Sequence, residues 1–423
     1  MAAPGPGALL GKLIAGLVAL LLLGLVLRLV LTPLASAGPY LQQWWADGAT
    51  LTALVQRLLV DWPQTWDWPS YLRWLRPGQG AVVPLTALLA WAIVIFGFML
   101  PMVTYQIYAL RKVVGFMQAR VGPTQVGPHG LLQTPADVVK LLTKEDVIPH
   151  NADRFVFTLA PFLVLVPASM AYLVIPFGNQ GVAADGTVTY GLVAGDLNIG
   201  LLYLISISSV AVIGVISAGW ASNNKYALLG SMRSAAQLIT YEVPLTLSLL
   251  PSALWVGTLN LSEIAAYQDH FLHWLAWPSL FGLLIFAISA LSELAHVPFD
   301  LPEAESELVS GYNVEYSGMK FAMFFLAEFS NAFILSALGV TLFLGGWQSP
   351  FPATVPVLGW DHGVFALAWF FAKTFSIVFF LFWLRATLPR LRIDQLMALG
   401  WKLMIPIGLL NVVLVAALKV WIG

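Results

Sequence analysis

The sequence contains no cysteine. This absence excludes disulfide bonds, a cysteine nucleophile and an iron–sulfur cluster held by thiolates of this chain. Six histidines are present, but they show no metal-ligand spacing such as H-E-x-x-H, so we expect no bound metal; they are His129, His150, His270, His273, His296 and His362. Any electron carriers that serve this chain are expected to lie on other chains.

Charged residues are also scarce, at 10% of 423 residues, and the net charge of −1 offers no basic surface for nucleic acid. Hydrophobic residues make up 59% and the mean hydropathy is +0.83, which is typical of a polytopic membrane protein. We therefore expect an all-α transmembrane helical bundle. Nine apolar stretches reach the roughly 20 residues that a spanning helix needs: 9–31, 82–108, 155–177, 199–219, 234–257, 275–295, 320–345, 364–386 and 398–421.

Lysine and arginine are missing from three alternate loops, 178–198, 258–274 and 346–363. The other connections carry them, and cytoplasmic loops are enriched in these residues. We therefore expect the charged loops in the cytoplasm and the C-terminus outside. The residues that set this orientation are Arg111, Lys112, Arg120, Lys140, Lys144, Arg154, Lys225, Arg233, Lys320, Arg385, Arg390 and Arg392.

Residues 1–81 form a separate N-terminal extension in our interpretation, and residues 82–423 form the main domain with eight spans. We expect 9–31 to be a retained transmembrane helix and 51–76, rich in Leu and Trp, to lie at the outer interface. A signal peptide is the alternative, because Leu34-Ala35-Ser36-Ala37 resembles a cleavage site.

Glutamates are concentrated beside or inside the membrane around residues 296–331. A carboxylate at hydrocarbon depth costs several kcal/mol, and it usually marks an ion path or a polar pocket. Glu242 and Glu328 lie within apolar helices, although Glu242 could simply neutralise Arg233, about two turns away. Glu303, Glu305 and Glu307 follow Pro298 and Pro302, so a solvated loop is the alternative to a role inside the membrane for these three. The full set is Glu242, Glu293, Glu303, Glu305, Glu307, Glu315 and Glu328.

A second polar segment covers residues 111–149. Its pairs Gly122-Pro123 and Gly127-Pro128 predict turns, so this segment is not one continuous helix. After Pro135 the pattern predicts a short amphipathic helix along the surface. Asp137 and Lys140 lie on that helix at i and i+3, where they could form an ordinary surface pair.

Three long motifs resemble those of the H-subunit family (subunit 1 in mitochondria) of proton-pumping NADH:quinone oxidoreductase, respiratory complex I. The first runs from Arg111 to Asp146, the second (NNKY…RxxAQ…YExP) covers 223–244, and the third (PFDLPEAExELVxGYxxEYSG) covers 298–318. The resemblance extends over roughly 82–423 and implies eight transmembrane helices. It also implies a bacterial cell membrane location, quinone as substrate, and no flavin or iron–sulfur cluster on this chain.

The resemblance assigns roles to individual residues. It implies a quinone channel formed by Arg111, Gln118, Arg120, Asp137 and Lys140. It implies that the seven glutamates couple quinone reduction to proton translocation, supported by Glu145, Asp146, Arg233, Asp300 and Tyr312. The implied partners are peripheral-arm quinone-site and iron–sulfur subunits, small membrane subunits, antiporter-like subunits and membrane lipid.

Two positions depart from the family pattern. Leu110 stands where relatives usually have Glu, and His296 stands where they usually have Arg, a change that could be compensating. Two other functions stay open at this point. A secondary transporter would also use buried carboxylates, but we find no self-similar halves. A membrane anchor of a related energy-converting complex with a different electron donor would share the same motifs.

Overall fold

The computed structural model describes residues 85–178, 181–182, 188–189, 197–302, 305–351 and 364–422. The chain divides into two units, Met1–Ala90 and Trp91–Gly423, and the description below concerns the second unit and the helix that leads into it. The expected N-terminal helix at 9–31, the interfacial segment at 51–76 and the alternative cleavage site lie outside the described residues.

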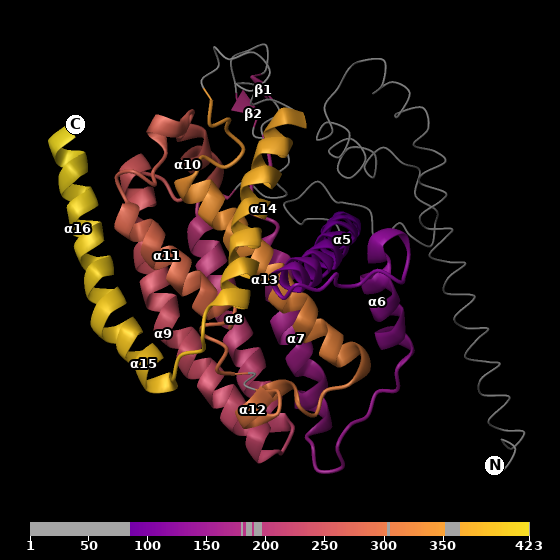
Figure 1. The fold of residues 1–423 in the computed structure, drawn as a ribbon. Helices are drawn as coiled ribbons and strands as arrows, with labels where there is room; N and C mark the ends of the chain where they lie inside the picture. The colour runs from indigo at the N-terminus through magenta and orange to yellow at the C-terminus, as the bar shows by residue number, and fades with distance from the viewer. Residues whose placement is uncertain are drawn as a thin grey trace, which may run out of the picture. The chain divides into compact units, whose positions relative to one another are not determined.

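The regular secondary structure of the described residues is almost entirely helical (Figure 1), which confirms the predicted all-α polytopic bundle. A two-stranded antiparallel ladder, in which Gly181 pairs with Thr189, is the exception. The elements are α5 (Leu85–Met117), η3 (Pro128–Gly130), α6 (Gln133–Thr143), α7 (Arg154–Ala171), β1 (Gly181–Val182), β2 (Val188–Thr189), α8 (Gly200–Ala221), α9 (Lys225–Val256), α10 (Leu261–Tyr267), η4 (Phe271–His273), α11 (Leu280–Glu293), α12 (Glu305–Leu308), η5 (Gly311–Asn313), α13 (Gly318–Phe343), α14 (Val364–Thr387), α15 (Ile393–Ala398), the π-helical segment η6 (Leu399–Met404) and α16 (Ile405–Ile422).

Six of the described helices are long and apolar enough to cross a membrane: Arg154–Ala171, Gly200–Ala221, Lys225–Val256, Gly318–Phe343, Phe365–Thr387 and Ile393–Trp421. The helix α11 has only 14 residues, so the expected span at 275–295 was too long. Pro278 disfavours helix before it, and Ala295, with φ of 51°, lies just beyond the helix end. This helix is shorter than a straight membrane crossing requires.

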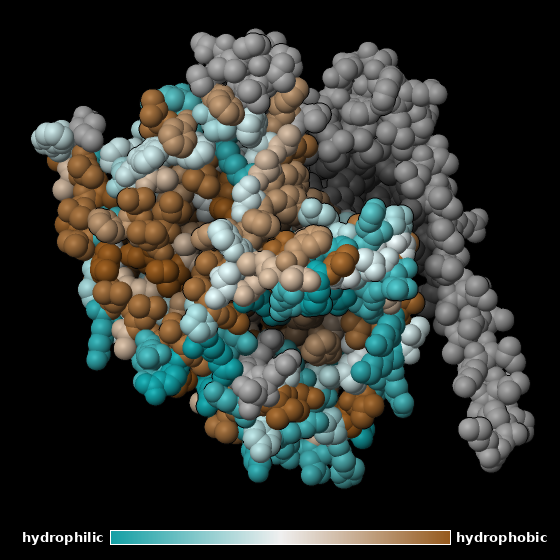
Figure 2. Space-filling model, in the orientation of Figure 1, coloured by the Kyte–Doolittle hydropathy of each residue, from teal (hydrophilic) through white to brown (hydrophobic). Residues whose placement is uncertain are grey.

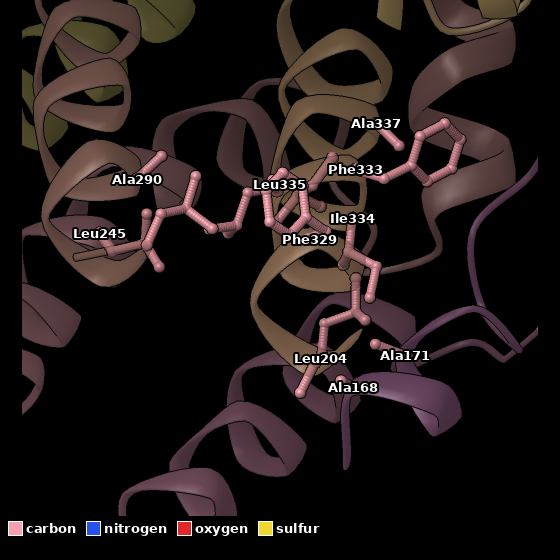
Figure 3. Packing of buried hydrophobic residues seen from close by; sticks show 14 of the residues in the cluster. Ala168, Ala171, Leu204, Leu245, Ala290, Phe329, Phe333, Ile334, Leu335 and Ala337 are labelled. Carbon is pink, nitrogen blue, oxygen red and sulfur yellow. The ribbon is translucent and has the colours of Figure 1, made fainter. Parts of the chain in front are cut away.

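The helices α9 and α13 form the centre of the second unit. The former packs against α8, α11 and α16, and the latter packs against α7 and α14. Figure 3 shows Ile334 of α13 pointing toward Leu204 of α8, beside Ala168 and Ala171 of α7. Phe333 is fully buried in the same cluster. Side chains from α7, α8 and α13 therefore meet in this cluster.

Glycines in α8 permit close contact between neighbouring helices. A Cβ atom on Gly214 would lie 2.6 Å from Val164 of α7, and one on Gly219 would lie 2.1 Å from the hydroxyl oxygen of Ser231 in α9. Small residues at such positions let helix backbones approach, which is a main source of packing energy inside a bilayer.

The surface separates into apolar and polar regions. Figure 2 shows hydrophobic residues over the middle of α11 and α16, and hydrophilic residues gathered at the end of the unit that carries α12. Large apolar side chains of α16 are exposed, which fits contact with lipid; they include Leu409, Leu410, Val413 and Leu414. We call the end with α12 the polar end.

The turns expected in the 111–149 segment are present. Gly122 and Gly127 have φ of 69° and 72°, values that favour glycine because a Cβ atom would be strained there. The helix α6 begins at Gln133, two residues before Pro135, which is tolerated because first-turn amides need no intrahelical acceptor. Its side chains Val138, Val139 and Leu142 are exposed.

Candidate functional site

A cavity of about 120 Å³ lies inside the second unit, between α7, α8, α9, α11 and α13. Three carboxylates line it: Glu242 from α9, Glu293 from α11 and Glu328 from α13. The volume holds several water molecules, and ionisable groups beside water can exchange protons. The structure thus brings together three of the seven predicted glutamates.

Glu242 accepts a hydrogen bond from the hydroxyl group of Ser209 on α8. The sequence offered Arg233 as its alternative partner. The structure instead places Arg233 Nη1 2.8 Å from Glu307 Oε2. Neutralisation of Glu242 by Arg233 is therefore excluded in this arrangement, and Glu242 faces the cavity and a neutral hydroxyl group.

Glu328 lies beside two nitrogen-bearing side chains from other elements. Its Oε1 is 3.4 Å from Nδ1 of His296 and 3.7 Å from Nη1 of Arg385. The same Arg385 nitrogen lies 3.4 Å from His296 Nδ1. His296, one of the two departures from the family pattern, is 1% exposed and lies beside this carboxylate. The guanidinium of Arg385 lies next to it.

Glu307 bridges two parts of the chain at the polar end. Its second oxygen, Oε1, lies 3.0 Å from Arg390 Nη2, after α14. The hydrogen bond from Arg233 and the charge of Arg390 lower the pKa of the Glu307 carboxyl. Glu307 therefore acts as an exposed ionic link and does not face the cavity.

The remaining acidic residues of the third motif have different places. Glu315 accepts a 2.6 Å hydrogen bond from Asn224, whose own side chain oxygen caps the first turn of α9. This contact joins the second motif to the third. Asp300 is half-buried in the loop that follows α11. Glu305 begins α12, and Glu303 lies outside the described residues.

Tyr312 lines the cavity and packs edge-on against Phe324 of α13, with ring centroids 5.5 Å apart. Gln237 of α9, a residue that the sequence analysis did not single out, is 1% exposed at the same cavity. Its amide donates to the carbonyl oxygens of Ser292 and Phe299, at 2.6 and 3.0 Å. It therefore ties α9 to the chain that leaves α11.

The expected quinone-channel residues are partly brought together. Arg111 of α5 and Asp137 of α6 form an ion pair of 2.5 Å, and Gln133 donates to the other oxygen of Asp137 at 3.1 Å. Arg120 donates to Gln118 at 2.7 Å in an exposed turn. Lys140 is exposed, so the partner of Asp137 is Arg111 and not the neighbour three residues away.

The end of this segment contacts the start of α13. Asp146 pairs with Lys320 at 2.8 Å, and the carbonyl oxygen of Glu145 accepts a 3.4 Å hydrogen bond from Ser317. Contacts made by side chains therefore join all three sequence motifs to one another.

Arg385, His296 and Ser209 are site residues that sequence reasoning did not place. Arg385 ends an apolar helix, a position typical of the positive-inside border, so its position alone gave no sign of a carboxylate partner. Ser209 is one of several serines in α8. His296 was recognisable only as a departure from the family pattern.

The fold and the cavity define a polytopic membrane protein that holds carboxylates inside a helical bundle. Comparison with known proteins gives the family. The family model described as NADH dehydrogenase matches residues 90–416, which is most of the chain. The protein belongs to this family, which comprises the H subunits (subunit 1 in mitochondria) of complex I.

Relatives that are about 50% identical in sequence agree with this family assignment. The H subunit of NADH-quinone oxidoreductase from Brevibacillus brevis is 49% identical over 325 residues, covering 77% of this chain and 91% of that protein. The H subunits from Geobacillus kaustophilus and Bacillus cytotoxicus are each 50% identical, over 323 and 329 residues, covering 76% and 78% of this chain and 91% and 92% of theirs.

Proposed function

We propose that this subunit forms the quinone entrance and binding channel of a proton-translocating NADH:quinone oxidoreductase, together with the carboxylate-lined link from quinone reduction to proton pumping. The observation that carries the proposal is the meeting of Glu242, Glu293 and Glu328, from three helices, at one cavity. The names of its relatives support NADH:quinone oxidoreduction as the reaction. The motifs shared with the family support the quinone-channel role and the proton-coupling role.

The proton-coupling role rests on charge inside the bundle. Carboxyl groups that share a water-sized space influence one another, so the charge of one changes the proton affinity of the next. Ser209 beside Glu242, and His296 and Arg385 beside Glu328, supply polar neighbours for the charged forms. In this proposal, the cavity carboxyl groups take up and release protons when quinone reduction changes the charge at the polar end.

The quinone role rests on the 111–146 segment. Arg111 and Asp137 join α5 to α6, and exposed apolar side chains lie next to the polar ones. A quinone has a polar headgroup and an apolar tail, so a channel for it needs both kinds of surface. The apolar side chains are Phe116, Val121, Leu131, Leu132, Val138, Val139 and Leu142.

The position in the complex follows from the same features. We propose that the polar end faces the cytoplasm of a bacterial cell and meets the peripheral-arm quinone-site and iron–sulfur subunits. The antiporter-like and small membrane subunits then contact the helices within the membrane. The one-sided distribution of lysine and arginine supports this orientation.

The test is Glu242→Gln in the complete complex. Glutamine keeps the size of the side chain but does not exchange a proton. We expect normal assembly and a loss of most quinone-linked pumping, with Glu263→Gln, an exposed glutamate of α10, as the matched control. Pumping per electron is measured in liposomes. An unchanged proton-to-electron ratio at normal turnover would exclude Glu242 from the proton path.

A further inference from the structure

Three potential metal ligands meet in the loop between α10 and α11, at the end of the unit opposite the polar end. Oδ1 of Asp269 lies 2.6 Å from Nδ1 of His270 and 2.6 Å from Nδ1 of His273. The two imidazole centroids are 4.0 Å apart. One ligand atom from each side chain lies within 4.8 Å of the other two.

The local backbone explains why these side chains converge. His270 immediately precedes the 3₁₀ turn η4, and the amide of His273 donates to the carbonyl oxygen of His270 at 2.9 Å. A 3₁₀ helix has three residues per turn, so side chains at i and i+3 lie directly above one another. The two imidazoles therefore share one side of the turn, and Asp269 precedes it.

Hydrogen bonds of one buried side chain anchor the loop to the bundle. Gln268 is fully buried, and its amide nitrogen donates to the carbonyl oxygens of Ile264 and Thr341 at 3.1 and 3.0 Å. Its amide oxygen accepts from the backbone amides of Leu275 and Gly345, each at 3.1 Å. Because Gln268 is adjacent to Asp269, the ligands lie on a fixed frame, which a metal site needs.

We propose that Asp269, His270 and His273 bind a divalent transition-metal ion of the zinc class. Two imidazole nitrogens and one carboxylate oxygen form a set that suits Zn²⁺, with water as a fourth ligand. The carboxylate also balances part of the ion's charge. This site is independent of the quinone and proton roles proposed above.

Binding of a zinc ion requires only a small movement of the three ligand side chains. Tetrahedral ligands at about 2.0–2.2 Å from zinc are about 3.4 Å from one another. The two nitrogen–oxygen distances of 2.6 Å thus need to open by less than about 1 Å. Asp269 and His273 are 61% and 57% exposed, so their side chains can rotate and solvent reaches the site.

The test uses the purified complex after treatment with a chelator. Zinc binding is measured by equilibrium dialysis with radioactive Zn²⁺ for the wild type, for His270→Gln/His273→Gln, and for His150→Gln. His150 is an exposed histidine at the polar end and serves as the matched control. We expect the double variant to lose one bound zinc per complex and the control to keep it. X-ray absorption at the zinc edge of the wild-type complex should show a zinc ion with two imidazole ligands, and this contribution should be absent from the double variant.

An equal number of bound ions with unchanged Kd in the double variant overturns the proposal, and leaves only a carboxylate hydrogen-bonded to two imidazoles. If the double variant does not assemble, His273→Gln replaces it, because this histidine is the more exposed of the two. A higher Kd for that variant supports the site, and an unchanged Kd overturns it.

Discussion

Arg233 on α9 donates to Glu307 at 2.8 Å, although Glu242 lies two turns away on the same helix. Arg390 binds the other oxygen of Glu307 at 3.0 Å. Two cations at the polar end are thereby engaged by one exposed carboxylate, whereas Glu242 faces the cavity. This division separates an ionic link that joins parts of the chain from a carboxylate that lines the cavity.

The ionic link predicts a pH dependence of stability. The pKa of Glu307 is lowered by the hydrogen bond from Arg233 and the charge of Arg390. A lowered pKa in the folded state stabilises the protein above the carboxyl's unfolded pKa of about 4.3, and this stabilisation is lost as the pH falls through the lower folded value. The difference in Tm between wild type and Glu307→Gln should therefore be constant from neutral pH to about pH 5 and shrink below it. A difference that grows with acidification would contradict the assignment.

The group around Glu328 predicts energetic coupling. Arg385→Gln removes a cation 3.7 Å from the carboxylate, and Glu328→Gln removes the charge that it faces. Contacting charged residues usually give non-additive effects, and we expect a coupling energy of about 1 kcal/mol. A double-mutant cycle on the thermal stability of the purified complex measures it. Strictly additive shifts would mean that the two groups act independently.

The quinone role predicts a selective loss of activity. Asp137→Leu leaves Arg111 without its carboxylate partner, and Arg120→Ala removes a cation from the neighbouring turn. Both should lower quinone-dependent turnover while NADH oxidation by artificial electron acceptors stays intact, because in the function proposed above electrons enter the complex on other subunits. Arg392→Ala, at an arginine that is 76% exposed outside this segment, is the control. A parallel fall of both activities would indicate failed assembly.

The proposed orientation can be tested by cysteine labelling, because the chain has no native cysteine. Ser222, a natural choice from the sequence, is only 3% exposed, so Lys225→Cys and Thr143→Cys are better cytoplasmic reporters. Glu263→Cys in α10 reports on the other side. We expect an impermeant reagent to label the first two from the cytoplasm and the third from outside, with the wild-type chain as background. Labelling of Glu263→Cys from the cytoplasm would reverse the topology.

Hydropathy located the helices but not their ends. The helix α9 begins at Lys225, nine residues before the expected span, because helical hydrogen bonding includes the polar residues that precede the apolar run. The helix α11 is shorter than expected, because a proline and a left-handed residue limit it. The length of an apolar run indicates how much of the chain favours lipid. The length of a helix also depends on its capping residues and on helix-breaking residues.

The sequence by itself determined the membrane class, the family and the presence of Glu242 and Glu328 within apolar helices, because these follow from composition, long motifs and the cost of buried charge. Only the tertiary structure decided the partners: Glu307 for Arg233, Arg385 and His296 for Glu328, and Arg111 for Asp137. It also gathered Asp269, His270 and His273, although no metal was expected from the histidine spacing. A charged residue can be identified from the sequence, but its partner depends on helix packing. Residues tens of positions apart meet only when the helices that carry them are in contact.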